Sequence, residues 1–236
     1  MTIAVIQARM SSSRFPGKVL MPILGKPMVI HQLERLSLSK RIEKIIVATS
    51  TDQSDDILAR ALTSSGYEVH RGPLDDVLLR YLQVIDAVDA EDYVRITADC
   101  PLIDHQVVDL VIERHLNSGS DYTSNTLQRT YPRGLDVEIF KKSVLQKLIN
   151  FNLSVEEREH VTMGIYNRPE MFSLHGVEQF PSQGHHRWTV DTKADFDFVT
   201  LVYEAIYEKN HNFLQEDILS LLRDKPEMVH FEDSTI

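Results

Sequence analysis

Strand-like and helix-like segments alternate in the first 119 residues, and this alternation constrains the fold more than any other feature of the chain. The strand-like segments are short and mostly apolar, and the helix-like segments carry apolar residues at helical spacing. The predicted strands are 2–8, 43–50, 67–72 and 92–98, and the predicted helices are 26–38, 54–66, 74–88 and 104–119. Such alternation is typical of βαβ units, which form a parallel sheet with helices on both faces. Ligands bind these sheets beyond the carboxyl ends of the strands.

The pattern becomes less regular after about residue 120. Here the predicted strands are 121–125, 134–140 and 171–180, and the predicted helices are 154–167, 193–208 and 213–223. No Gly/Ser-rich or Pro-rich linker separates the two halves, and no internal repeat is found. We therefore expect one domain over residues 1–236, an α/β fold in which a mixed, mostly parallel sheet carries helices on both faces.

Acidic residues are absent from the first 33 positions, although the whole chain has a formal net charge of −10. Arg9, Arg14, Lys18 and Lys26 lie in this stretch, and the first acid is Glu34. A local reversal of charge of this kind indicates a site that receives an anion.

The basic loop from Gln7 to Lys18 follows the first predicted strand and permits two interpretations. It is not a P-loop, because the early glycine of that motif is missing and Val19 stands where a hydroxyl is required. It is not a dinucleotide fingerprint, because Gly17 is its only glycine. The loop is either a solvated basic loop or one that wraps a triphosphate with backbone N–H groups, serine hydroxyls and cations. Its position after a strand and its lack of acids favour the second.

Several classes of protein are disfavoured by composition. A sequence pI near 5.4 argues against broad nucleic-acid binding. The apolar runs are too short to span a bilayer, and no secretory signal is visible, so we expect no membrane partner. The single cysteine, Cys100, excludes an internal disulfide and fits a reducing compartment. We expect a cytoplasmic protein.

Residues 6–29, IQARMSSSRFPGKVLMPILGKPMV, are similar to the signature of the sugar-activating cytidylyltransferases. The likeness is closest to the SpsF-like group, named for spore coat polysaccharide biosynthesis and related to the CMP-sialate and CMP-Kdo synthetases. It extends in order through 71–81, 95–104, 133–140, 157–162 and 186–199. The resemblance implies a three-layer, Rossmann-like fold of the nucleotide-diphosphosugar-transferase type. It also implies a nucleotide-binding half at 1–120, a sugar-binding and dimerisation half at 121–236, and a homodimer.

The reaction that this resemblance implies is attack of a sugar oxygen on the α-phosphate of CTP, giving a CMP-sugar and pyrophosphate for surface polysaccharide synthesis. Such a transfer depends on alignment and charge neutralisation, usually with Mg²⁺. Asp99 and Asp191 match the family's two metal-binding aspartates, and each follows an apolar, strand-like run. Their carboxylates should lie within roughly 4–8 Å if they share one ion directly or through water. The alternative is that both aspartates are turn or helix caps.

The same resemblance assigns the nucleotide site. Arg14 and Lys18 would grip the phosphates and, with Asp99, carry the catalysis. The nucleotide-binding residues would be Gln7, Ala8, Arg9, Ser12, Ser13, Arg71, Gly72 and Thr97.

On the acceptor side, the resemblance places the strand that carries Arg133, Asp136 and Glu138 beside a small anionic sugar. Alternation puts Asp136 and Glu138 on one strand face, and Arg133 or Arg187 could pair a carboxylate. Glu157 and His160 are three residues apart on one face of the predicted helix. A solvated, charged helix face is the alternative for that pair.

Two rival functions remain at this point. A nucleotide-sugar-dependent glycosyltransferase commonly carries an Asp-x-Asp metal motif, and the only such spacing here, Asp195 to Asp197, falls inside a predicted helix. A non-catalytic nucleotide-binding protein would have no need of the full set Arg14, Lys18, Asp99 and Asp191.

Overall fold

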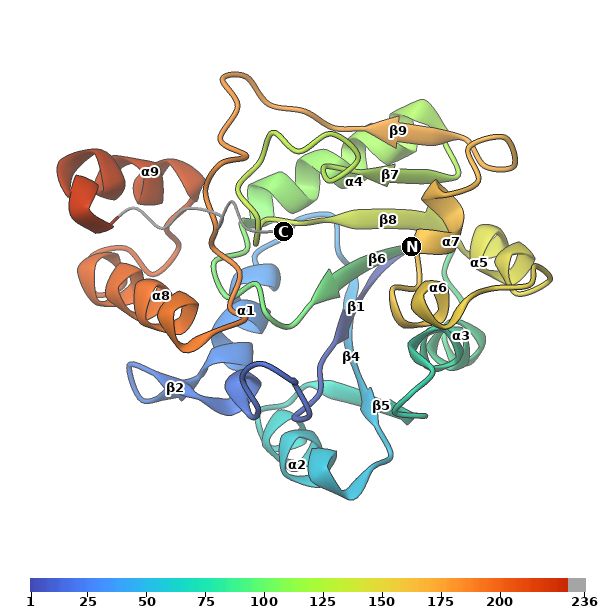
Figure 1. Ribbon diagram of the computed structural model, residues 1–236, viewed down its shortest axis with the longest axis horizontal. Helices are drawn as coiled ribbons and strands as arrows, with labels where there is room; N and C mark the ends of the chain where they lie inside the picture. The colour runs from blue at the N-terminus through green and yellow to red at the C-terminus, as the bar shows by residue number, and fades with distance from the viewer. Residues whose placement is uncertain (229–236) are drawn as a thin grey trace.

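The computed structural model describes residues 1–228, and within them seven strands form one twisted sheet in the order β5-β4-β1-β6-β8-β7-β9 (Figure 1). The strands of the sheet are β1 (Thr2–Gln7), β4 (Lys44–Ser50), β5 (Glu68–Gly72), β6 (Asp92–Thr97), β7 (Tyr122–Ser124), β8 (Glu138–Lys141) and β9 (Leu174–Gly176). Pairing is parallel except on both sides of β8, which runs against β6 and β7. A separate antiparallel ribbon joins β2 (Pro22–Ile23) to β3 (Lys26–Pro27).

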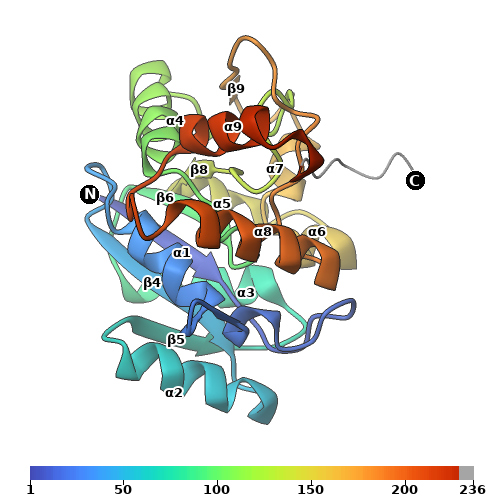
Figure 2. The same ribbon diagram turned by 90° about the vertical axis from the view of Figure 1, so that its left-hand side faces the viewer.

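Helices cover both faces of this sheet. They are α1 (Met28–Leu36), α2 (Asp56–Ser64), α3 (Val77–Ala87), α4 (His105–Ser118), α5 (Lys142–Leu148), α6 (Val155–Glu159), α7 (Met163–Tyr166), α8 (Lys193–Ile206) and α9 (Gln215–Asp224). Figure 1 shows α1 and α8 on one side of the sheet and α3, α5, α6 and α7 on the other, and Figure 2 shows α4 and α9 on the side of α1 and α8. The predicted α/β fold with a mixed, mostly parallel sheet is confirmed.

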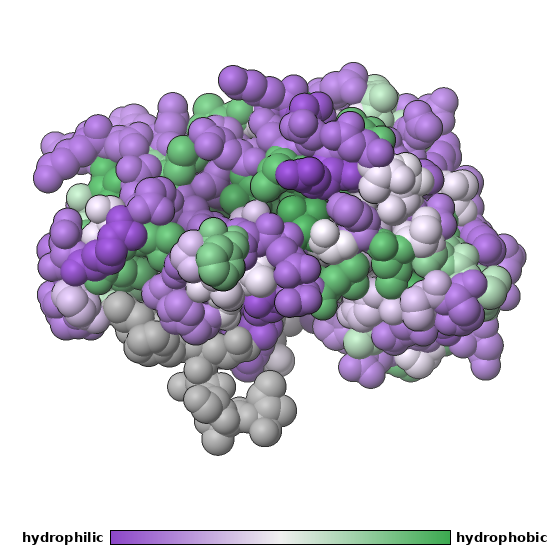
Figure 3. Space-filling view, turned by 90° about the horizontal axis from the view of Figure 1, so that it is seen from above, coloured by the Kyte–Doolittle hydropathy of each residue, from purple (hydrophilic) through white to green (hydrophobic). Residues whose placement is uncertain are grey.

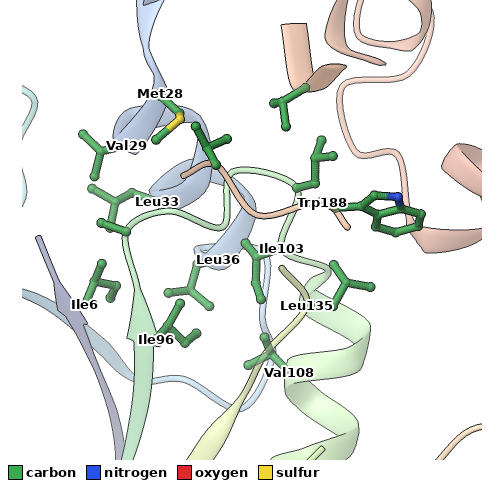
Figure 4. Close-up of a cluster of buried hydrophobic side chains, with 14 of the residues drawn as sticks. Ile6, Met28, Val29, Leu33, Leu36, Ile96, Ile103, Val108, Leu135 and Trp188 are labelled. Carbon is green, nitrogen blue, oxygen red and sulfur yellow. The ribbon is translucent and has the colours of Figure 1, made fainter. Parts of the chain in front are cut away.

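The alternation of side chains along β1 explains the two cores. Ala4 and Ile6 point into the cluster beneath α1, α4, α8 and α9, while Ile3 and Val5 point into the cluster beneath α3, α5 and α7. All four are fully buried. Figure 4 shows the first cluster, where Ile6 and Ile96 of the sheet face residues of α1. Because both faces of the sheet are buried, the sequences of the strands are nearly continuous apolar runs.

The irregular second half differs from the sequence prediction in several places, among them the strand expected over 171–180, which is only β9. The helix expected over 154–167 is two short helices, because the backbone turns through a left-handed Val161 (φ 54°) between them. The strand expected over 134–140 begins only at Glu138. Gly134 (φ 109°) instead lets the chain approach the backbone of Trp188 so closely that a Cβ would lie 2.6 Å from it. Helix α5 has no counterpart in the prediction.

Hydrophilic residues dominate the face seen from above, and hydrophobic residues form small separate patches on it (Figure 3). Among the described residues, no helix combines the length and apolar character that crossing a membrane would require.

Candidate active site

A polar cavity of about 310 Å³ opens beyond the carboxyl ends of β1 and β6. Eleven of the residues expected at the site line it: Gln7, Ala8, Arg9, Ser12, Ser13, Arg14, Lys18, Thr97, Asp99, His160 and Asp191. Val19, Arg95, Ala98 and Glu159 complete the lining. The cavity therefore joins the basic loop, the end of β6, the end of α6 and the segment before α8.

The conformation of the basic loop is set by local backbone contacts. Gly17 adopts the left-handed region (φ 75°), and its N–H donates to the carbonyl of Met10 at 2.9 Å, which closes the loop. The N–H of Met10 donates to Asp55 Oδ1 at 2.6 Å, which ties the loop to the segment after β4. The chain then enters a 3₁₀ turn at Lys18–Leu20, and the Lys18 side chain, 7% exposed, extends into the site.

Lys18 lies between the two aspartates. Its ammonium donates to the carbonyl of Val190 at 2.6 Å and lies 3.1 Å from Asp191 Oδ1 and 3.6 Å from Asp99 Oδ2. These two carboxylate oxygens are therefore no farther apart than the sum of 3.6 and 3.1 Å. That limit is below the roughly 8 Å allowed for two carboxylates that share one Mg²⁺.

Asp191 is the most heavily paired acid of the cavity. Arg14 and Arg187 contact its Oδ2 at 2.9 and 2.8 Å, in addition to Lys18 on Oδ1. Burial by itself raises the pKa of the Asp191 carboxyl, but the charge and hydrogen bonds of Lys18, Arg187 and Arg14 outweigh it, so the pKa is lowered. This carboxylate is ionised at neutral pH.

The segment that carries Asp191 is not a strand, and the expectation that this residue ends one is wrong. Val190 N–H and Thr189 Oγ1 donate to the carbonyl of Asp99 at 2.8 and 3.2 Å, so the segment is fixed to the turn after β6. Buried Trp188 anchors it in the core (Figure 4). The cap of α8 is Thr192, in a capping box with Asp195, so Asp191 is left to face the cavity.

The Asp99 side chain is oriented by neighbouring residues at the end of β6. Thr97 Oγ1 donates to Asp99 Oδ1 at 2.5 Å, and the Cys100 thiol lies 3.4 Å from the same oxygen. Burial, followed by the charge of Asp99, raises the pKa of the Cys100 thiol well above its usual value, so this cysteine is a neutral donor. Asp99 Oδ2 is thereby left on the side of Lys18.

The donor set fits Mg²⁺ better than a transition metal. Across residues 1–228, no three His, Cys, Asp or Glu side chains come together to hold a metal ion. Two carboxylates on rigid backbone suit Mg²⁺, which takes the rest of its shell from phosphate oxygens and water.

Arg71 and Gly72, expected at the nucleotide base, lie outside the cavity at the end of β5. Arg71 donates from Nε to the carbonyl of Ser50 at 2.7 Å and pairs with Asp56 at 2.7 Å. Gly72 is required by packing, since a Cβ there would lie 2.8 Å from Arg80 Cγ. Contact of this segment with a base stays a prediction.

Five residues expected to bind the sugar also lie outside the cavity. Asp136 forms a two-point ion pair with Arg129 at 2.8 and 3.1 Å. Glu157 closes the capping box of α6 and pairs with Arg168 at 2.5 Å. Arg187 pairs with Asp195 at 3.0 Å as well as with Asp191.

The remaining two are Arg133 and Glu138. The backbone of Arg133 pairs with the segment at Arg187. Glu138 lies behind the cavity, where it pairs with Arg95. The cavity lining thus includes more of the residues expected to bind the nucleotide than of those expected to bind the sugar.

Arg95 and Glu159 are the charged lining residues that sequence reasoning missed. Glu159 accepts from Arg9 Nη2 at 3.0 Å across the cavity mouth, and this pairing of residues 150 positions apart leaves no local signal. Arg95 had a signal, because it is a charged residue between the apolar residues Val94 and Ile96 of a buried strand.

The fold and this edge-of-sheet site define an α/β nucleotidyltransferase. The chain belongs to the Cytidylyltransferase family, which it matches over residues 3–222. It is 31% identical over 231 residues to the spore coat polysaccharide biosynthesis protein SpsF of Bacillus subtilis, covering 94% of each chain.

Two solved structures share this fold. A cytidylyltransferase from Leptospira borgpetersenii superposes with a TM-score of 0.92 at 30% identity, covering 100% of this chain and 98% of that one. CMP:2-keto-3-deoxy-manno-octonic acid synthetase in complex with CTP superposes with a TM-score of 0.67 at 20% identity, covering 86% and 98%, and so shares the fold.

Proposed function

We propose that this enzyme transfers a cytidylyl group from CTP to a sugar acid of the nonulosonate or Kdo class, giving a CMP-sugar and pyrophosphate. The observation that carries the proposal is the cluster of Lys18, Asp99 and Asp191 at the base of the cavity, with Arg14 of the basic loop beside it. The choice of CTP and of a sugar acid is supported by membership of the family and by what the similar synthetase binds and makes.

In this reaction a hydroxyl oxygen of the sugar forms a bond to the α-phosphorus of CTP, the bond from that phosphorus to the bridging oxygen of pyrophosphate breaks, and the hydroxyl proton passes to water. Asp99 and Asp191 would hold Mg²⁺, which supplies charge neutralisation at the phosphates. Lys18 and Arg14 would exchange their carboxylate partners for phosphate oxygens, and the N–H groups and hydroxyls at Ser12 and Ser13 would orient them. Positioning and electrostatics account for the catalysis, with no covalent intermediate.

We also propose that residues 1–120 bind the nucleotide and that 121–236 supply the acceptor side and a homodimer contact. The product would serve surface polysaccharide synthesis in the cytoplasm. These statements rest on the family resemblance.

Pyrophosphate release tests the proposal. In single-turnover reactions with Mg²⁺, each of the four nucleoside triphosphates is combined with 2-keto-3-deoxy-manno-octonic acid, N-acetylneuraminate and related sugar acids. We expect release only with CTP and one or a few of the acids, together with a CMP-sugar identified by mass. If no sugar acid of the panel gave pyrophosphate release, or if ATP were used as well as CTP, the proposal would be contradicted.

A further inference from the structure

Arg95 occupies the floor of the cavity on the β6–β8 side. Its side chain is only 8% exposed, yet it belongs to the lining. Along β6, Arg95 and Thr97 point to one face of the sheet, and Gln7 of β1 lies on the same face. Its hydrogen-bond partners, Glu138 and Gln7, are not those of Lys18, which contacts Asp99, Asp191 and the Val190 carbonyl.

The Arg95 guanidinium is held by two neighbouring strands. Nη1 donates to Glu138 Oε1, its partner in the antiparallel register of β8, and Nη2 donates to Gln7 Oε1 at 3.1 Å. The other oxygen of Glu138 accepts from Tyr122 at 2.9 Å and from Thr162. Glu138 is itself held by three donors, so it fixes the position of the guanidinium.

Hydrogen-bonding capacity remains on this buried cation. A guanidinium has five N–H donors, and the contacts to Glu138 and Gln7 engage one hydrogen on each Nη. Its buried Nε has no hydrogen-bond partner within the described residues, so the guanidinium keeps a donor that a carboxylate, which accepts from two N–H groups at once, could engage.

The other cations of the cavity have different tasks. Arg14 and Lys18 contact Asp191, and Arg9 pairs with Glu159 at the mouth. Arg95 is the remaining Arg or Lys of the lining among the described residues, and its partner Glu138 comes from β8, in the half of the chain that we propose supplies the acceptor side.

We propose that Arg95 binds the carboxylate of the sugar acid and that Glu138 is the positioning residue that orients it. The inference rests on the proposed function and adds the group that selects an acid over a neutral sugar. Arg95 would contact substrate, whereas Glu138 would act through Arg95 and not through the sugar hydroxyls.

The test compares a sugar acid with its own methyl ester, which has the same shape and lacks the charge. The acid is whichever of the panel above wild type uses best, and kcat/KM is measured for acid and ester. Two variants are examined: Arg95→Lys, which keeps the charge but loses the fork, and the double variant Arg95→Met with Glu138→Gln, which leaves no buried unpaired charge. CTP binding by calorimetry shows that each variant is folded and keeps its nucleotide site.

We expect wild type to favour the acid over the ester by about 10- to 100-fold, as one charge-assisted contact predicts. The double variant should bring that ratio to within about threefold of one, with CTP affinity changed by less than about threefold. Arg95→Lys should retain part of the preference. A double variant that keeps the wild-type ratio would refute the role of Arg95 while leaving the proposed function intact. Failure of wild type to use any sugar acid would overturn both.

Positioning by Glu138 is tested with Glu138→Gln and a matched control, Tyr122→Phe, which removes a donor to the other oxygen of Glu138. Glu138→Gln should raise the KM for the acid about tenfold with little change in kcat, because the guanidinium loses its orientation. Tyr122→Phe should change it by less than about threefold. Equal effects of the two variants would indicate a merely structural role.

Discussion

Replacing Lys18 by methionine is the most direct test of the phosphate site. The ammonium is buried among three oxygens, with the Val190 carbonyl at 2.6 Å and the two aspartates at 3.1 and 3.6 Å. Methionine keeps most of the length of the side chain and removes its charge. The substitution therefore separates the cation from the packing that carries it.

The magnitude follows from what the ammonium contacts. Loss of one preorganised charged contact to a phosphate should cost about 2–4 kcal/mol of transition-state stabilisation, which is roughly 30- to 1,000-fold in kcat/KM. The Val190 carbonyl loses its donor, which should cost about 1–3 kcal/mol of stability. That corresponds to a fall in Tm of roughly 2–12 °C for a chain of this size. Asp191 still pairs with Arg14 and Arg187, so the fold should survive.

Steady-state pyrophosphate release with CTP measures the activity, and the Tm from calorimetry shows whether the variant is folded. Lys26→Met is the matched control, because Lys26 lies in the same acid-free stretch but pairs at 2.7 Å with the partly exposed Glu34. Activity of the Lys26 variant should stay within about threefold of wild type. A folded Lys18→Met enzyme whose kcat/KM is also within threefold would refute the assignment of this loop to the triphosphate.

Three further predictions concern the cavity and its scaffold. Asp191→Asn should abolish the Mg²⁺ dependence of CTP binding and lower kcat/KM by about 100-fold or more. If the CTP affinity of the variant, measured by calorimetry, responded to Mg²⁺ as in wild type, Asp191 would be excluded as a metal ligand. Because the pKa of Asp191 is lowered below its ordinary value of 3.8, the stability that its ionised form contributes is present above about pH 4 and is lost as the pH falls through the folded pKa. Wild type should therefore lose more Tm than Asp191→Asn between about pH 4 and 2, and parallel pH profiles would show that the contacts contribute no stability. Gly134→Ala should destabilise the protein by at least about 3 kcal/mol, since a Cβ would lie 2.6 Å from the Trp188 and Thr189 backbone at φ 109°; a Tm within 2 °C of wild type would contradict this packing.

The first half of the fold was predictable because its signals are local. A short apolar run predicts a buried strand, and an Asp or Ser before an apolar-periodic segment predicts the start of a helix. Each of these patterns involves only a few neighbouring residues. Asp104 caps α4 at the residue where the sequence places its start, and Asp76 caps α3 two residues after the predicted start at 74. The second half depends on features without such signals. Val161 is β-branched and still adopts a left-handed conformation, which tertiary packing imposes and sequence propensity opposes.

The acceptor side of the site was missed for a related reason. The contact between Arg95 and Glu138 depends on the antiparallel register of β8 on β6, and that strand is out of sequence order in the sheet. An arginine inside a buried strand needs an acidic partner, but the sequence does not indicate which acid that is. Glu138 was selected as a sugar ligand because it alternates with Asp136 along the chain, whereas the side chain is turned to a neighbouring strand.

In the folded chain, acids distant in sequence balance the cations of the basic loop. Arg9 pairs with Glu159, Arg14 with Asp191, and Lys18 with both Asp191 and Asp99. These three cations of the loop therefore already have carboxylate partners before any substrate binds. A triphosphate must compete with these carboxylates, and it can do so if a divalent cation enters with it and takes over their negative charge. This exchange predicts that CTP and Mg²⁺ bind as a coupled pair, each weakly alone, because either one by itself would leave a partly buried charge without a partner.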